Sequence, residues 1–260
     1  MAARCLADRH GSRQPKERHM SASETASMTK LARTAGLLYL VVIVTGIFNL
    51  IYVPSQLSAH GDAAATIERI TQSQLLFQLG IVADLICNAA FLLLPLALYR
   101  LLDATGRNAA LLMVAFAVIQ VPIAFVNATH RLDVLWLLGD VRHPQALTTD
   151  QLHVQVMLAL NAYRNGLLVL EVFWGLWLLP LGYLVFKSGF LPRLLGVLLM
   201  LGCFGYLADF LGTLLLPSYP TSATADYITL PASLGEIGIC LWLLVIGART
   251  LTWRARPAIS

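Results

Sequence analysis

Residues 161–185 read NAYRNGLLVLEVFWGLWLLPLGYLV, and the apolar part of this stretch is long enough to cross a bilayer as one helix. It nevertheless carries Arg164 and Glu171 at or inside the apolar zone. Helical steps of three, four and seven place both side chains in one polar stripe with Asn161 and Asn165. An ionised side chain that faces lipid costs roughly 3 kcal/mol or more near the bilayer centre. The stripe is therefore expected to face the inside of a helix bundle.

Composition places the whole chain in the membrane class. Of its 260 residues, 58% are hydrophobic and 12% are charged, whereas a soluble domain has about 25% charged residues. The formal net charge of +4 comes mainly from the N-terminal tail and the short loops, so it is a signal of membrane topology. Nucleic-acid binding needs a basic face on a soluble module. The expected partner is therefore the lipid bilayer, and no nucleic acid is expected.

Long apolar segments predict an all-α fold, a polytopic membrane bundle of six transmembrane helices. The segments cover approximately residues 34–53, 75–99, 108–129, 161–185, 194–216 and 227–248. Basic residues gather before the first segment, in the second and fourth connections, and after the last segment. Because Lys and Arg concentrate on the cytoplasmic side, both termini are predicted to be cytoplasmic. The predicted location is the cell membrane, as a multi-pass protein of the bacterial inner membrane.

The remaining parts of the chain are short and polar. Residues 1–27 are predicted to be a disordered basic tail, residues 28–250 the transmembrane domain, and residues 251–260 a short cytoplasmic tail. The connection after the first segment contains Asp62, which is a good helix N-cap and predicts a short helix on the membrane surface. Thr149 or Asp150 is expected to cap a helix that leads into the fourth segment.

Motifs for cofactors and metals do not occur in the sequence. The cysteines are isolated and form no Cys-x-x-Cys pair, so they are interpreted as small apolar core residues. A Gly-rich phosphate loop, a Gly-x-Ser-x-Gly elbow and a His-Glu-x-x-His zinc motif are likewise missing from the sequence. Neither a cofactor nor a metal is expected.

Carboxyl groups on separate segments are predicted to meet in the outer half of the bundle. At ~1.5 Å of rise per residue, Asp84, Glu171, Asp209 and Glu236 fall at similar depth. Such groups cannot all ionise cheaply side by side, and Arg164 is the nearest basic residue in the pattern. The candidate ligand-binding residues are Asp84, Asn88, Gln120, Asn127, Arg164, Glu171, Tyr206, Asp209 and Glu236.

Three interpretations of this constellation follow. In the first, the helices leave a polar pocket that opens outward and holds a small polar or cationic ligand, as in a transporter or a sensing module. In the second, a carboxylic acid and a carboxylate act together as acid and base in a membrane-embedded enzyme. In the third, ion pairs and hydrogen bonds only lock the bundle of a structural or accessory subunit.

Several short motifs carry a family resemblance. They are ARTAGLLY (32–39), VTGIF (44–48), GDAAAT (61–66), LGIVADL (79–85), LYRLL (98–102), GYLVFKSGFLPRLLG (182–196) and LWLL (241–244), the last preceded by Glu236. In this order, over residues 28–250, the chain resembles a bacterial family of multi-span membrane proteins catalogued only as a domain of unknown function. The resemblance implies a helical inner-membrane protein, with no established substrate, cofactor or catalytic residue. Asp84 and Glu236 lie inside matching motifs.

Overall fold

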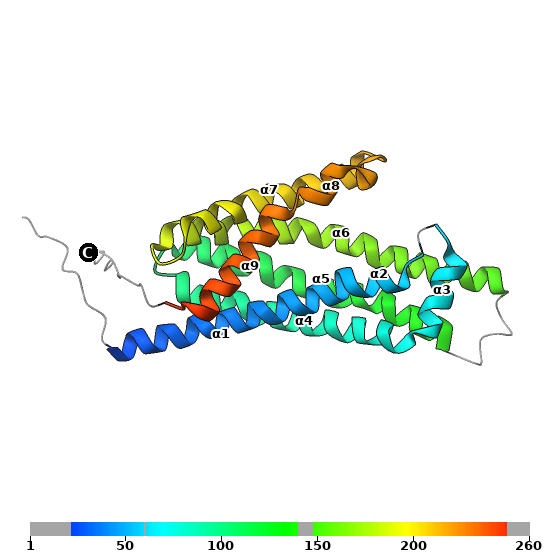
Figure 1. Ribbon diagram of the computed structural model, residues 1–260, viewed down its shortest axis with the longest axis horizontal. Helices are drawn as coiled ribbons and strands as arrows, with labels where there is room; N and C mark the ends of the chain where they lie inside the picture. Colours follow the sequence, from blue (N-terminus) through cyan, green and yellow to red (C-terminus); the bar gives the residue numbers. More distant parts are fainter. Residues whose placement is uncertain (1–21, 60, 140–147, 249–260) are drawn as a thin grey trace, which may run out of the picture.

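The computed structural model describes residues 22–59, 61–139 and 148–248 and shows a bundle of long helices (Figure 1). Six helices in this part of the chain are long and apolar enough to cross a membrane. They cover Ala26–Leu57, Gln74–Leu102, Arg107–Gly139, Thr149–Ser188, Arg193–Leu215 and Ala223–Val245. Each contains or overlaps one predicted apolar segment, so the all-α fold with six membrane-spanning helices is confirmed.

The first span is composite, and a proline explains why. It consists of α1 (Ala22–Ile47), the π-helical turn η1 (Phe48–Tyr52) and α2 (Val53–Leu57). Pro54, near the start of α2, has no N–H, and its ring clashes with the carbonyl four residues earlier in a regular α-helix. The wider turn avoids this clash, since Val53 donates its N–H to Phe48 O. Asn49 lies in this π-helical turn and is 4% exposed.

A short helix follows the first span, as the sequence predicted. This helix is α3 (Ala63–Gln72), and the Asp62 carboxylate accepts the Ala65 N–H at 2.9 Å as its N-cap. Ile67 and Ile70 are buried, and α3 packs on α2, α4 and α6 at one end of the bundle (Figure 1). The short helix is therefore confirmed, and its position on a membrane surface remains a prediction.

The long helices form a closed ring. The remaining ones are α4 (Gln74–Leu102), α5 (Arg107–Gly139), α6 (Thr149–Ser188), α7 (Arg193–Leu215) and α9 (Leu230–Val245). The turn η2 (Tyr219–Thr221) and α8 (Ala223–Tyr227) connect α7 to α9. Each long helix packs against the next along the chain, and α9 packs back against α1.

The start of α6 differs from the sequence expectation by one or two residues. Thr148, rather than Thr149 or Asp150, caps the helix. Its hydroxyl accepts the Gln151 N–H while the Gln151 side chain accepts the Thr148 N–H, so the two residues form a capping box. From there α6 runs without a break through His153 to Ser188, as expected.

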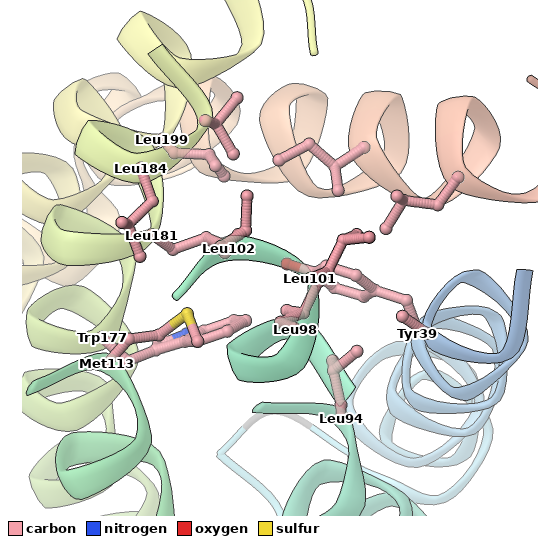
Figure 2. Close-up of a cluster of buried hydrophobic side chains, with 14 of the residues drawn as sticks. Tyr39, Leu94, Leu98, Leu101, Leu102, Met113, Trp177, Leu181, Leu184 and Leu199 are labelled. Atoms are coloured by element: carbon pink, nitrogen blue, oxygen red, sulfur yellow. The ribbon is translucent and has the colours of Figure 1, made fainter. Parts of the chain in front are cut away.

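Apolar side chains fill the centre of the ring near the end where α1 begins. Trp177 from α6 lies between Tyr39 of α1 and Phe91 of α4, with ring centroids 6.1 and 4.9 Å away. Leucines from α4, α6 and α7 surround it (Figure 2). Tyr39 belongs to this apolar cluster and also donates its hydroxyl to Glu236 Oε1, so polar side chains reach its border.

Both ends of the described chain lie at the same end of the bundle (Figure 1). A Cβ at Gly247 would lie 3.0 Å from the Thr29 side chain, so the two segments touch. The cytoplasmic placement of this end remains a prediction. The structure describes α1 from Ala22 onward, whereas the membrane domain was predicted from residue 28, and the rest of both predicted tails lies outside the described residues.

Candidate functional site

Polar side chains inside the bundle form two groups. The first, which we call the Arg131 network, joins η1, α4, α5 and α6 and consists of Asn49, Asp84, Asn88, Arg131 and Tyr163. The second, which we call the acid group, consists of the carboxyl groups of Glu171, Asp209 and Glu236 around Tyr206. The two groups differ in charge, because only the first contains a cation.

Arg131 is held by aromatic and amide groups. Its side chain comes from α5, is 4% exposed and donates from Nη1 to the Asn49 Oδ1. The guanidinium carbon lies 4.9 Å from the Phe77 ring centroid and 5.1 Å from that of Tyr163, which are cation–π distances. A Cβ at Gly80 would lie 2.5 Å from Nη2. Gly80 on α4 thus lies directly against this arginine, and a side chain there would displace the guanidinium.

Neutral side chains connect Arg131 to the Asp84 carboxylate. Asn49 Nδ2 donates to the Tyr163 hydroxyl at 3.1 Å, and that hydroxyl donates to Asp84 Oδ2 at 3.0 Å. Asn88 Nδ2 donates to Asp84 Oδ1 at 3.0 Å. Both carboxylate oxygens thus have a partner, and the two opposite charges are joined through an amide and a phenol. This arrangement satisfies the polar groups that span the four helices.

Two further buried amides lie on α5. Asn127 donates from Nδ2 to the Tyr163 carbonyl at 3.0 Å, and a Cβ at Gly166 would lie 1.9 Å from its Oδ1. Gln120 is 2% exposed, and its Oε1 has no hydrogen-bond partner among the described residues. Asn127 is therefore a contact between α5 and α6, whereas Gln120 retains an unused acceptor.

Replacing Tyr163 with phenylalanine is expected to lower the free energy of unfolding by about 1–3 kcal/mol, since Asn49 and Asp84 both lose a buried partner. Thermal unfolding of the purified protein in detergent measures this change. Tyr52→Phe is the matched control, because Tyr52 is half exposed and its hydroxyl makes no hydrogen bond in the described structure. Equal stabilities of the two variants would contradict a bridging role for the Tyr163 hydroxyl.

The acid group contains tyrosine partners and no basic one. The Tyr39 hydroxyl donates to Glu236 Oε1 at 2.9 Å, and the Tyr219 hydroxyl donates to Asp209 Oδ1 at 2.8 Å. Glu171 Oε2 is a buried atom and has no partner within the described residues. No Lys or Arg in the described part of the chain forms an ion pair with any of these carboxylates.

Charge interactions extend across the acid group. Tyr206 lies within electrostatic range of Glu236, Glu171 and Asp209, and Glu171 and Asp209 lie within range of each other. The Trp174 ring packs edge-on against Tyr206 with centroids 6.0 Å apart. Among residues 22–59, 61–139 and 148–248, no three His, Cys, Asp or Glu side chains come close enough to share a metal ion.

Tyr219 remains a hydrogen-bond donor at ordinary pH. It lies in the connection between α7 and α8, and its ring is 9% exposed. Burial, then the hydrogen bond to Asp209 and the charge of that carboxylate, raise the pKa of Tyr219 to about 12. The phenol therefore stays protonated and can keep its hydrogen bond to Asp209 throughout the physiological range.

The predicted constellation changes in two respects. Arg164 and Asn161 are exposed, and the Arg164 guanidinium donates to the Asn161 side chain. The prediction that this end of the α6 stripe faces the interior is therefore wrong, and Tyr163 faces inward instead. The predicted gathering of all the carboxyl groups is also divided, because Asp84 belongs to the Arg131 network.

Glu236 also lies at a different level from Asp209. Gly235, next to Glu236, packs on Leu199, so Glu236 is nearer the start of α7 than Asp209 is. Tyr206 lies between these levels on α7 and reaches both. The structure thus places Glu171 and Asp209 near each other and Glu236 at another level, with Tyr206 in electrostatic range of all three. Asp84 and Asn88 lie in the other network, and Arg164 lies in neither.

Several residues of the two groups were not among the sequence candidates. They are Tyr39, Asn49, Arg131, Tyr163 and Tyr219. The tyrosines are counted as apolar in a hydropathy pattern although each has a polar hydroxyl. The sequence signal for Tyr163 was a tyrosine directly beside the expected polar stripe, whose hydroxyl could also take part in the polar interior.

Comparison with known proteins gives a family without an assigned activity. A family model described as a domain of unknown function (DUF4386) matches residues 34–247. The chain is also similar to an uncharacterised protein of Archaeoglobus fulgidus, with 27% identity over 153 residues, which is 59% of this chain and 74% of the relative. No solved structure gives a significant match.

Proposed function

The chain belongs to the DUF4386 family of domains of unknown function, whose description assigns no activity, and we propose that it binds a small cationic ligand inside its helix bundle, at the acid group. The observation that carries this proposal is a set of intramembrane carboxyl groups with no cation beside them in the described residues. Glu171, whose Oε2 is buried without a partner, is the central ligand-binding residue. Asp209 and Glu236 complete the negative charge.

The charge balance of the bundle supports a ligand at this place. An ionised carboxylate in a low-dielectric environment is costly unless a cation or several donors stabilise it. In the Arg131 network, Arg131 supplies the positive charge and amides supply the donors. In the acid group, two tyrosine hydroxyls supply the only side-chain hydrogen bonds to the carboxylates in the described structure. A cation from solution therefore compensates a charge that the described chain leaves uncompensated.

The aromatic side chains favour an organic cation. The Trp174 and Tyr206 rings meet edge to face beside Glu171 and Asp209. Ring faces attract ammonium groups by about 0.5–2 kcal/mol, depending on how well the cation is desolvated. An amine or quaternary ammonium compound uses both the carboxylates and the rings, so this is the ligand class we expect.

The Arg131 network favours a structural role instead. Both Asp84 oxygens are occupied, and Arg131 packs between two rings. We infer that this network locks η1 of the first span to α4, α5 and α6, as in the interpretation of a purely structural constellation. The ligand-binding role is thus restricted to the side of the bundle formed by α6, α7 and α9.

The test is ligand-dependent stability of the purified protein in detergent. Tetramethylammonium, choline, ethylamine and a diamine are added at matched ionic strength, with sodium chloride as the reference. Binding raises the free energy of unfolding by about 2.7 kcal/mol when the ligand concentration is 100 times Kd. We expect one or more of these cations to raise Tm of the wild type, and Glu171→Gln and Glu236→Gln to abolish most of the increase.

Glu68→Gln is the matched control, because Glu68 is exposed on α3 and its only side-chain partner there is Gln72. This variant should respond to ligand as the wild type does. Without ligand, Glu171→Gln should be at least as stable as the wild type, because the substitution removes a carboxylate that lacks a partner. If no cation shifts Tm, or if both glutamine variants respond like the wild type, the proposal is wrong.

Further measurements then distinguish transport of the bound cation from sensing of it. In a transporter, the ligand crosses the bilayer, so proteoliposomes should accumulate it and Glu171→Gln should not. In a sensing module, the ligand binds with the same Tm shift but no uptake. A membrane enzyme predicts instead that the cation is chemically altered during incubation, which mass spectrometry of the ligand detects.

A further inference from the structure

Tyr219 is the side chain from the α7–α8 connection that reaches the acid group. The chain leaves α7 after Leu215 and turns in η2, and the Tyr219 side chain then folds back along α7 (α7 and α8 are labelled in Figure 1). Its hydroxyl donates to Asp209 Oδ1 at 2.8 Å. The same side chain lies within electrostatic range of Glu171. One residue of a short connection therefore contacts α7 beside Asp209 and lies within electrostatic range of a carboxylate on α6.

The Tyr219 ring packs directly against Gly212 of α7. A Cβ on Gly212 would lie 2.7 Å from two ring carbons, which is far closer than any side chain tolerates. Gly212 stands one helical turn beyond Asp209, so the ring covers α7 from its end up to the carboxylate. With Gly212 beneath it, the Tyr219 ring is only 9% exposed.

Backbone hydrogen bonds hold the connection in this position. The Tyr219 N–H donates to Leu216 O at 2.9 Å. The Ser222 N–H and hydroxyl both donate to Tyr219 O, at 2.8 and 2.7 Å. Ser222 also caps α8. The backbone at Tyr219 is thus fixed at both sides, while its side chain rests on one hydrogen bond and one ring contact.

We propose that Tyr219 is a gate over the acid group, closed in this structure by its hydrogen bond to Asp209 and its packing on Gly212. The gate rests on the proposed ligand-binding function, since it controls access to the same carboxylates. A cation that binds Asp209 competes with the phenol for the same oxygen. A bound ligand therefore favours the open state, in which the Tyr219 hydroxyl is released and its side chain has rotated away from Asp209.

Access to the acid group can be measured without any ligand. Glu171→Cys is introduced after the native cysteines (Cys5, Cys87, Cys203 and Cys240) are replaced by alanine. The reagent is the thiol-reactive, positively charged methanethiosulfonate ethyltrimethylammonium. The rate of modification of the purified protein in detergent is then compared with Tyr219 intact and with Tyr219→Phe, Tyr219→Ala or Gly212→Ala.

We expect a graded increase in rate. Tyr219→Phe keeps the ring and removes the hydrogen bond, which should raise the rate up to about tenfold, the ratio that corresponds to ~1.4 kcal/mol. Tyr219→Ala removes the ring as well and should raise the rate further. Gly212→Ala displaces the Tyr219 ring from α7 without changing Tyr219 itself, so it should raise the modification rate as Tyr219→Ala does.

Glu68→Cys on α3 is the control position, since its modification rate should be the same in all four backgrounds. If the Glu171→Cys rate is unchanged in both Tyr219→Ala and Gly212→Ala, Tyr219 is not a gate. If only Tyr219→Ala fails to fold, Gly212→Ala and Tyr219→Phe decide the question. If Tyr219→Ala and Gly212→Ala raise the modification rate but Tyr219→Phe does not, the ring is the gate. The hydrogen bond to Asp209 then does not hold the gate closed.

The outcome is independent of the ligand test. Faster modification combined with no Tm shift for any cation supports the gate and removes the proposed ligand class. A Tm shift with unchanged modification rates supports ligand binding and removes the gate. Each proposal can therefore fail alone.

Discussion

Replacing Arg131 with methionine is expected to lower the free energy of unfolding by about 3–5 kcal/mol, because it leaves the opposite charge of a buried pair uncompensated. The Arg131 guanidinium is 4% exposed. It bonds Asn49 and packs between the Phe77 and Tyr163 rings. Methionine has a similar apolar length but neither charge nor donors. Chemical or thermal unfolding in detergent measures the loss.

A double-mutant cycle separates the charge from the packing. If Asp84 and Arg131 compensate each other through Asn49 and Tyr163, then Arg131→Met combined with Asp84→Asn should cost less than the sum of the single losses. Coupling energies within such networks are about 0.5–3 kcal/mol. Additive losses would show that Arg131 acts by packing alone and that the two charges are energetically independent.

Arg164→Met is the matched control for this prediction. Arg164 is also an arginine in a spanning helix, but it is exposed, and Asn161 one turn earlier is its hydrogen-bond partner in the described structure. Exposed polar pairs of this kind contribute roughly 0.5 kcal/mol or less. A loss at position 164 as large as that at position 131 would contradict the structural assignment of both arginines.

These two arginines also show how far the sequence reaches. The helices were predictable, because apolar runs of about 20 residues have few alternatives. The inward faces were less so, because successive helical residues differ by about 100° in direction. Arg164 and Tyr163 are adjacent, and the pattern selected the first, whereas the structure buries the second. The rotation of α6 depends on packing, including the contact of Asn127 with Gly166.

For the candidate site, the sequence predicted which carboxyl groups lie in the spanning helices but not how they are grouped in space. Glu171, Asp209 and Glu236 do share an electrostatic environment around Tyr206. Their separation from Asp84 was not predictable, because it follows from which helices become neighbours in the ring. The π-helical turn η1, in which the buried Asn49 lies, was likewise not predictable from the apolar pattern.

Glycines determine how closely the helices on the acid-group side approach. A Cβ at Gly202 in α7 would lie 2.6 Å from both Cα and Cβ of Ala232 in α9. A Cβ at Gly182 in α6 would lie 2.7 Å from the Gly196 carbonyl oxygen of α7. These neighbours are backbone atoms or a Cβ, so they cannot rotate away. Close backbone contact of this kind is what small residues provide between membrane helices.

Gly202→Ala is therefore expected to destabilise the protein by about 3 kcal/mol, near the upper end of the usual cost of overpacking, because α7 and α9 must move apart. Gly46→Ala is the matched control, a glycine-to-alanine change inside α1 whose nearest neighbour would be Cys87 Sγ at 3.9 Å. Alanine has the higher helix propensity, so this variant should gain up to about 1 kcal/mol. Thermal unfolding of both variants in one detergent tests the pair. Equal effects at the two glycines would mean that α7 and α9 are not packed backbone to backbone.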